Sequence, residues 1–252
     1  MKRLLGLPIA LGAWLAARPV LASEGGSIKD PAEHWEHLWH EVLMDLYIFG
    51  GVFAVLAVYW ILKYRASSEG QDGTAGTLDR AQTWGWALVP AFLFMADDFF
   101  LAAKGWTLWN IQRNVPENAM EVKVTGSMWT FSFEYENGVT STFDVAEGKN
   151  AAGELGDGDG LVVPVGTPVV LRMTSTDVVH SFGLTEYRVK EDMMPGRITY
   201  LWFYPKEAKE SYVTCVEYCG TNHSRMFAKV KALPQAEFDA WMAAKKKEQN
   251  QG

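Results

Sequence analysis

The sequence has few cysteines and fewer cationic than anionic side chains. Only two of its 252 residues are cysteine, and they do not form the Cys-x-x-Cys-His pattern that attaches haem covalently. A covalent haem of that type is therefore excluded. With 23 Lys and Arg against 30 Asp and Glu, the formal net charge is −7. This balance argues against nucleic acid as a partner and favours a basic one.

Apolar residues are abundant instead: hydrophobic side chains make up 48% of the chain, and eleven residues are tryptophan, which favours a membrane protein. Residues 1–22 are typical of a secretory signal peptide. Lys2 and Arg3 precede an apolar run over residues 4–17, and residues 20–22 form a small-residue cleavage site. Pro8 and the shortness of the run argue against an uncleaved membrane helix. We expect a bacterial protein whose mature chain begins near Ser23, outside the cytoplasmic membrane.

Two apolar segments, about 42–62 and 83–103, predict a transmembrane hairpin within a first mature region, residues 23–110. Lys63, Arg65 and Arg80 flank the connecting loop, which places the loop in the cytoplasm. The residues after the hairpin then lie on the periplasmic side. The polar segment 27–41 carries three histidines at intervals of three, for which an interfacial helix is favoured over a metal site.

Asp97 and Asp98 interrupt the second predicted span. Residues 84–96 alone would reach only about 20 Å, too short to cross a bilayer, so the two acids lie in the outer part of the membrane. An intramembrane carboxylate is costly unless it meets a partner or water. A role in proton movement and a structural role against a partner subunit both remain open.

Residues 111–252 predict an all-β domain with a C-terminal helix. Short segments alternate apolar and polar side chains, with turns rich in Gly, Pro and Asn between them, as in a Greek-key sandwich or barrel. The segments are 121–125, 129–133, 140–145, 161–164, 169–174, 198–204 and 212–215. An apolar stripe over residues 234–247 predicts the terminal helix.

Both cysteines lie in one short motif. Cys219 follows Cys215 by four residues, His223 follows by four more, and Met226 by three more. Thiolate, imidazole and thioether are the ligands that soft, redox-active copper selects, and two thiolates in one loop can each bridge two ions. His180, after a β-rich run, is a further candidate ligand. The alternative is a disulfide, which would close only a small loop and leave the spacing of the other two residues unexplained.

The motif Cys215-x-Glu217-x-Cys219-Gly220-x-x-His223-x-x-Met226, with His180 upstream, resembles the binuclear copper (CuA) site of subunit II of haem–copper oxidases. The resemblance covers the whole mature chain, including the hairpin, and implies a cupredoxin-like domain. It implies side-chain ligands from His180, Cys215, Cys219, His223 and Met226 and a carbonyl ligand from Glu217. It also implies a magnesium ion shared with subunit I, to which the Glu217 carboxylate contributes.

The segment Gly126-Ser127-Met128-Trp129-Thr130-Phe131-Ser132-Phe133-Glu134-Tyr135 resembles the family's aromatic stretch, which implies that Trp129 takes the electron from cytochrome c. Met128, Thr130 and Phe131 replace residues usual in the family, so the docking surface differs. The family often has a glutamate at the start of the second span, at the mouth of a proton path. Here residues 79–84 contain none, which puts the usual route of proton uptake in doubt.

The resemblance thus implies a cytochrome c oxidase subunit II, an electron-transfer subunit of a multi-pass complex in the bacterial inner membrane. Electrons from cytochrome c would pass through the copper centre to haem in subunit I, where oxygen is reduced to water in an aerobic respiratory chain. One alternative is the CuA subunit of a haem–copper nitric oxide reductase, which Asp97 and Asp98 would suit. A second is a copper delivery or storage protein, which would need no tryptophan relay.

Overall fold

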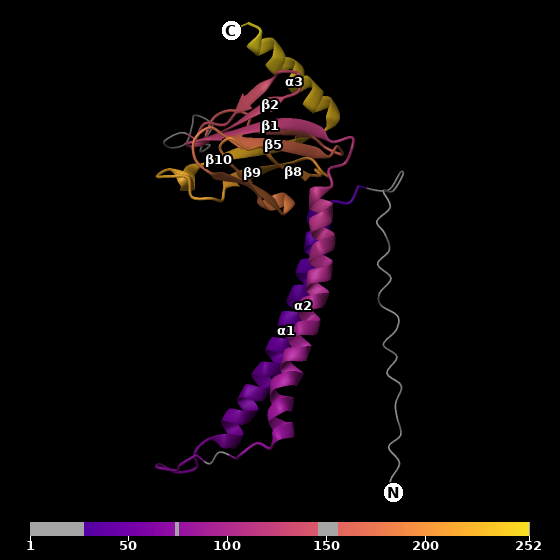
Figure 1. The fold of residues 1–252 in the computed structure, drawn as a ribbon. Coiled ribbons are helices and arrows are strands. Elements are labelled where there is room, and N and C mark those ends of the chain that lie inside the picture. The colour runs from indigo at the N-terminus through magenta and orange to yellow at the C-terminus, as the bar shows by residue number, and fades with distance from the viewer. Residues whose placement is uncertain (1–27, 74–75, 146–155, 252) are drawn as a thin grey trace, which may run out of the picture.

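The computed structural model describes residues 28–73, 76–145 and 156–251. The predicted signal peptide, residues 1–22, lies outside them. A long two-helix hairpin carries a β-domain at one end, and a short helix lies on the far side of that domain (Figure 1). The predicted fold class is therefore confirmed.

The hairpin consists of α1 (Pro31–Tyr64) and α2 (Arg80–Arg113), each of 34 residues. Both have side-chain N-caps: Asp30 accepts a hydrogen bond from the N–H of Ala32, and Asp79 forms a capping box with Gln82. At 1.5 Å per residue each helix is about 51 Å long, well beyond the roughly 30 Å of a hydrocarbon core. The predicted spans lie within these helices, and the polar segment 31–41 continues the first span without a break. The domain division near residue 110 stays a prediction.

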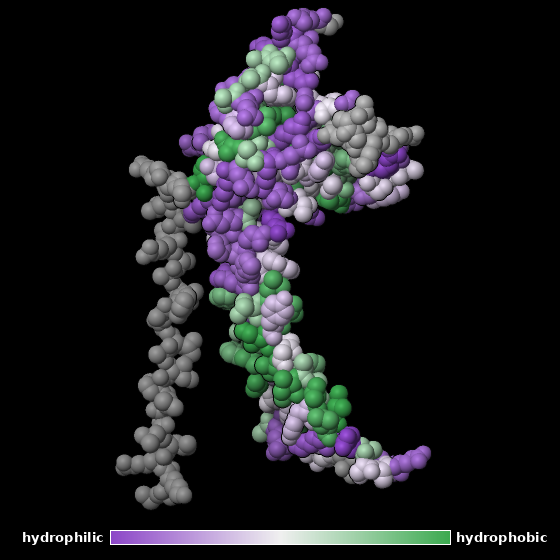
Figure 2. Space-filling view, turned by 180° about the vertical axis from the view of Figure 1, so that it is seen from behind, coloured by the Kyte–Doolittle hydropathy of each residue, from purple (hydrophilic) through white to green (hydrophobic). Residues whose placement is uncertain are grey.

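Both helices are long and apolar enough to cross a membrane. Figure 2 shows an apolar band around the middle of the hairpin, with polar side chains at both ends. The helices pack antiparallel: the rings of Phe49 and Phe94 lie 6.3 Å apart, and Lys104 forms an ion pair with Glu41 nearer the β-domain. Most side chains of the band remain exposed, so the hairpin offers a large apolar surface to lipid or to other subunits.

The β-domain is built from two five-stranded sheets. One has the order β3-β2-β1-β5-β8 and the other the order β4-β10-β9-β6-β7, with β1 parallel to β5 and β4 parallel to β10. The strands are β1 (Met120–Ser127), β2 (Thr130–Tyr135), β3 (Thr140–Thr142), β4 (Leu161–Pro164), β5 (Val169–Ser175), β6 (His180–Leu184), β7 (Val189–Met193), β8 (Thr199–Phe203), β9 (Lys209–Cys215) and β10 (Phe227–Leu233).

The core lies between the two sheets. Alternate residues of β2 point inward, and Phe131 and Phe133 meet Phe182 of β6 edge to face, at 5.1 and 6.3 Å between centroids. All four residues of β4 are buried, unlike those of a strand with one solvent face. The helix α3 (Gln235–Gln249) explains this, because it contacts β4 and packs Phe238 and Trp241 against the core.

Polar contacts fix the hairpin to the β-domain. Lys206 reaches the carboxylates of Asp30 and Glu33 at 2.9 and 2.8 Å, and Arg188 pairs with Glu36 at 2.7 Å. We call these residues the collar. On the other helix, the buried Trp202 donates a hydrogen bond from Nε1 to the carbonyl of Ile111 at 3.1 Å. Ion pairs at a surface individually contribute little to stability. Here they act together with an apolar contact, in which Trp202 packs with Ile111 and Val170.

The phenol of Tyr135 generates a prediction about the core. Its oxygen donates to the carbonyl of Val162 and accepts from the N–H of Val162, both at 2.9 Å, across the two sheets. Tyr135→Phe leaves both buried groups without a partner and should lower the free energy of unfolding by about 1–3 kcal/mol. Chemical denaturation of the detergent-solubilised chain measures the change. Tyr212→Phe on the exposed side of β9 is the control, and equal effects of the two substitutions would contradict the assignment.

Candidate metal centre

Two paired strands hold the predicted copper ligands. β6 begins at His180 and β9 ends at Cys215, and the strands pair antiparallel with Phe182 opposite Cys215. Residues 216–226, here called the copper loop, connect β9 to β10. The N–H of Cys215 donates to the carbonyl of Met226 at 2.9 Å and closes the base of this loop. The ends of the loop are therefore fixed by the sheet.

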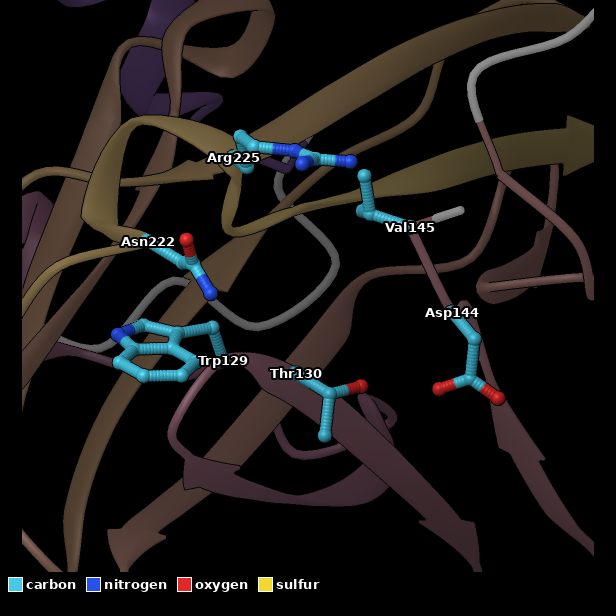
Figure 3. A pocket seen from close by; sticks show the side chains of 6 residues that line it. All are labelled: Trp129, Thr130, Asp144, Val145, Asn222 and Arg225. Carbon is cyan, nitrogen blue, oxygen red and sulfur yellow. The ribbon is translucent and has the colours of Figure 1, made fainter. Parts of the chain in front are cut away.

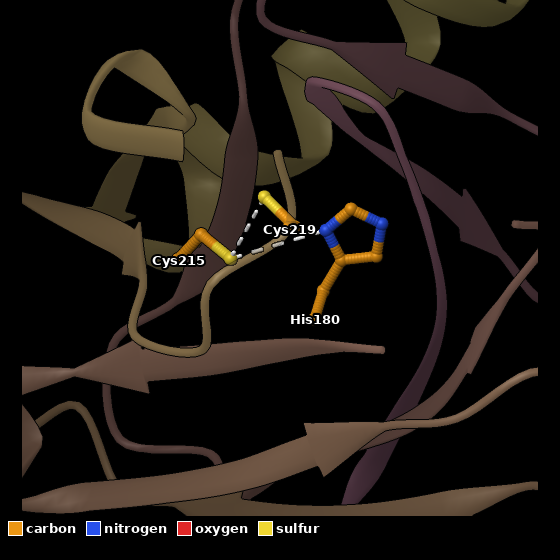
Figure 4. A group of neighbouring side chains, drawn as sticks. All are labelled: His180, Cys215 and Cys219. Carbon is orange, nitrogen blue, oxygen red and sulfur yellow. Dashed lines mark hydrogen bonds between the residues drawn. The ribbon is translucent and has the colours of Figure 1, made fainter. Parts of the chain in front are cut away.

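The sulfur and nitrogen atoms of the motif converge at the base of the copper loop (Figure 4). The Sγ atoms of Cys215 and Cys219 lie 3.7 Å apart, and both cysteines are free. The two cysteines therefore do not form the alternative disulfide in this structure. Cys215 Sγ lies 3.9 Å from Nδ1 of His180 and 3.2 Å from the carbonyl oxygen of Glu217. On the other side, Cys219 Sγ lies 3.6 Å from Nδ1 of His223 and 3.7 Å from Sδ of Met226.

The cluster is largely buried. His180 is 0% exposed and Met226 is 1% exposed, and both cysteines are buried. Burial, followed by the neighbouring thiol of Cys215, raises the pKa of Cys219 to about 12. Two adjacent thiolates would be strongly unfavourable here without a cation, whereas a bound metal deprotonates its thiol ligands. Two thiols, two imidazoles, a thioether and a carbonyl fit soft, redox-active copper.

Asp177, just before β6, orients the His180 ring. Its Oδ1 lies 2.8 Å from His180 Nε2, and its Oδ2 accepts from the backbone N–H of Met128 at 2.7 Å. Burial alone would raise the pKa of this carboxyl, but hydrogen bonds from His180 and from the N–H groups of Met128 and Val178 outweigh it and lower the pKa to about 2. An ionised carboxylate only accepts, so Nε2 carries the ring proton and Nδ1 presents a lone pair to the sulfurs.

Sequence reasoning missed Asp177. Its spacing of three residues before His180 was the available signal, because a carboxylate behind a metal-ligating histidine is a common arrangement. The contact to Met128 was not readable from the sequence, since it joins residues 49 positions apart.

Trp129 lies in the turn between β1 and β2 and covers the copper loop. Gly220 has φ +122°, and a Cβ added there would lie 3.3 Å from both Cζ2 and Nε1 of Trp129. The indole therefore packs against the backbone directly after Cys219, and any side chain at 220 would push it away. This contact gives the residue predicted to receive electrons a short path to a predicted ligand.

A cavity of about 390 Å³ opens beside the indole (Figure 3). Trp129 and Thr130 line one side, and Asn222 and Arg225 of the copper loop line another. Asp144, beyond β3, completes the wall with a charge opposite to that of Arg225. The outer rim of the site is thus both polar and charged.

The remaining predicted side chains lie apart from this cluster. The carboxylate of Glu217 is at the exposed surface of the copper loop, although its carbonyl faces Cys215. Asp97 is half-buried and Asp98 exposed on α2, in the membrane hairpin, and their proton or interface role stays a prediction. His34 binds the carbonyl of Asp30 at the start of α1.

Taken together, the molecule is a two-helix membrane hairpin that carries a cupredoxin-like sandwich with a buried cluster of soft donors. The family model for the periplasmic domain of cytochrome c oxidase subunit II matches residues 120–233. The alternative cytochrome c oxidase subunit 2 of Bradyrhizobium diazoefficiens is 28% identical over 233 residues, which cover 85% of this chain and 82% of that protein. Cytochrome c oxidase subunit 2 of Debaryomyces hansenii is 30% identical over 168 residues, covering 62% of this chain and 67% of that protein.

Among solved structures, the periplasmic domain of subunit II of cytochrome oxidase from Bradyrhizobium japonicum is 30% identical. The matched region covers 54% of this chain and 99% of that structure's chain, with a TM-score of 0.49. The chain spans 65% and 58% of the length of the subunits 2 of Metridium senile and Cereibacter sphaeroides. The chain belongs to the cytochrome c oxidase subunit II family.

The contact between Asp177 and His180 predicts a loss of copper affinity on substitution. Asp177→Asn preserves size but removes the charge that fixes the ring tautomer, and such changes behind a metal ligand typically cost 10–100-fold in affinity. Copper competition with a chelator measures the affinity of the detergent-solubilised chain. Asp239→Asn on α3 is the control, since that residue bonds to Gln235 far from the site. Wild-type affinity in Asp177→Asn would contradict the role of Asp177.

Proposed function

We propose that the chain is the electron-accepting subunit of a haem–copper cytochrome c oxidase in the bacterial inner membrane, with its β-domain in the periplasm. The observation that carries the proposal is the convergence of six predicted ligands. The two Sγ atoms are 3.7 Å apart, and each of the other four donor atoms lies 3.2–3.9 Å from one of them. Membership of the subunit II family and two helices able to span a membrane support it further.

His180, Cys215, Cys219, His223 and Met226 would hold a binuclear copper centre by their side chains, and Glu217 by its carbonyl. Such a centre, when bound, supplies a one-electron carrier whose unpaired electron is shared by two ions. The protein's part is to keep the donors fixed. The strand pairing of β6 with β9, the closed base of the copper loop and the carboxylate of Asp177 hold them in place without rearrangement.

Trp129 is the proposed point at which an electron from cytochrome c enters. It packs on Gly220, next to Cys219, and lines the cavity with Asp144 and Arg225. The half-exposed side chain of Met128 lies beside it. This patch is small and mixed in polarity, as in weak, short-lived electron-transfer complexes.

Haem belongs, in this proposal, to the partner subunit I, where oxygen is reduced to water. The exposed carboxylate of Glu217 is available to a magnesium ion shared with that subunit, while its backbone carbonyl serves the copper site. The relatives described above are oxidase subunits, which favours oxygen over nitric oxide as the acceptor. A copper delivery protein must release its ion, and a site whose His180 and Met226 are fully buried argues against that function.

The paired sulfurs predict two copper ions per chain. The purified, copper-loaded chain should contain two coppers and give the seven-line paramagnetic resonance of a shared electron. Cys215→Ser should abolish this signal, because the remaining thiolate cannot form the double sulfur bridge between the ions. Metal analysis and resonance spectroscopy make the test, with Ser224→Ala in the exposed part of the copper loop as the control. One copper per chain with a four-line spectrum would rule out the binuclear centre.

The position of Trp129 predicts a selective defect in electron uptake. Trp129→Phe keeps an apolar ring but loses the indole that contacts the backbone at Gly220. Reduction by cytochrome c, followed by stopped-flow absorbance, should slow by at least tenfold, while the copper spectrum stays that of the wild type. Trp241→Phe on α3 should change neither. A wild-type rate in Trp129→Phe would show that electrons enter elsewhere.

A further inference from the structure

The ring of His180 lies over a glycine of the facing sheet. A Cβ added at Gly126 of β1 would lie 3.3 Å from Cδ2 of that ring. The same Cβ would lie 3.1 Å from Cε and 3.4 Å from Sδ of Met193. Gly126 is buried, and the other two residues are both 0% exposed. The imidazole and the thioether therefore share the space over Gly126.

Met193 is the last residue of β7 and pairs with the first residue of β6, which is the histidine. Directly opposed residues of antiparallel strands have Cβ atoms about 4.5–5.5 Å apart, so the two side chains are neighbours. The backbone is fixed on both sides of Met193. Oγ1 of Thr199 donates to the carbonyl of Asp192 at 2.5 Å, and Oγ1 of Thr174 donates to the carbonyl of Met194 at 3.4 Å. The thioether is therefore held at one place beside the ring.

The imidazole of His180 is thus approached at three of its atoms. Nδ1 lies 3.9 Å from Sγ of Cys215, and Nε2 lies 2.8 Å from Oδ1 of Asp177. Contacts at the two nitrogens still permit the ring to tilt about the line that joins them. Cδ2 lies off that line, so close neighbours at Cδ2 oppose the tilt. In a close-packed interior such a displacement would leave a void on one side and an overlap on the other.

We propose that Met193 and Gly126 are positioning residues for the copper site, which together set the tilt of the His180 ring and so the direction of the lone pair on Nδ1. The proposal rests on the function proposed above and deepens it. Methionine suits this place because its unbranched thioether fills irregular space, and the absent side chain of Gly126 leaves room for it. The shell around a metal ligand tunes the metal, so the pair affects the reduction potential of copper as well as the stability of the fold.

The test compares two cavities in the full-length, copper-loaded chain in detergent. Met193→Ala removes the thioether beside the ring. Leu184→Ala truncates another residue that is 0% exposed, four positions further along β6, and is the control for a purely structural loss. Both changes should destabilise the fold. Only Met193→Ala should shift the reduction potential and one of the two imidazole nitrogen couplings seen by electron–nuclear double resonance. Met193→Leu nearly conserves the volume and should restore both readouts.

Gly126→Ala approaches the same ring from the facing sheet. Its methyl group would press on the ring and on the thioether, so the same nitrogen coupling should shift. In the double variant with Met193→Ala, the methyl group enters the vacated space, and the shift should be smaller than the two single shifts added together. Met193→Val leaves a smaller cavity and provides the same comparison should Met193→Ala not fold.

A wild-type potential and wild-type couplings in Met193→Ala would overturn the positioning role and leave the proposed function intact. An equal shift in Leu184→Ala, or strictly additive shifts in the double variant, would do the same. A wild-type chain whose bound copper shows no imidazole coupling would overturn the proposed function, and the positioning role with it.

Discussion

The arrangement of the site depends on placing two thiols side by side in a buried environment. Burial raises the pKa of Cys219 to about 12, so the thiol stays protonated unless a cation occupies the site. The same burial that disfavours free thiolates favours a tightly held metal, because a low dielectric strengthens the attraction between sulfur and ion. The surrounding fold meets this requirement through rigidity. The copper loop begins and ends on paired strands, so its donors are held together before any metal binds.

In the proposed function, a rigid metal site serves electron transfer only if the β-domain is also held at a fixed place above the membrane. The collar and the hydrogen bond from Trp202 to Ile111 join one stretch of the β-domain, residues 188–206, to both helices. The domain overhangs the hairpin on one side (Figure 1). The exposed apolar band lies along the same hairpin.

Much of this architecture could be predicted from local sequence patterns. The alternation of apolar and polar residues predicted most strands of the β-domain. The close spacing of Cys215, Cys219, His223 and Met226 indicated one cluster, because these residues share a loop. The pattern over β10, Phe227–Leu233, also alternates, but it went unrecognised. So did the capping box of Asp79 and Gln82, whose spacing marks the start of α2.

Contacts between distant segments could not be predicted in this way. Nothing local to Asp177 says that its second oxygen binds the N–H of Met128, or that Trp129 would rest on Gly220. Such contacts depend on the parallel pairing of β1 with β5, which brings the two segments to the same end of the sandwich. Likewise, the sequence placed Asp97 and Asp98 in the membrane, but only the packing of α1 on α2 distinguishes the two residues.

In the proposed function, sulfur and nitrogen donors from the copper loop and β6 hold two copper ions together. Copper K-edge X-ray absorption of the loaded, full-length chain tests this most directly, because it reports the atoms around each ion without reference to turnover. We predict scattering from thiolate sulfur and imidazole nitrogen together with a second copper at short range. Scattering from oxygen and nitrogen alone, or sulfur ligation without a neighbouring copper, would contradict the account.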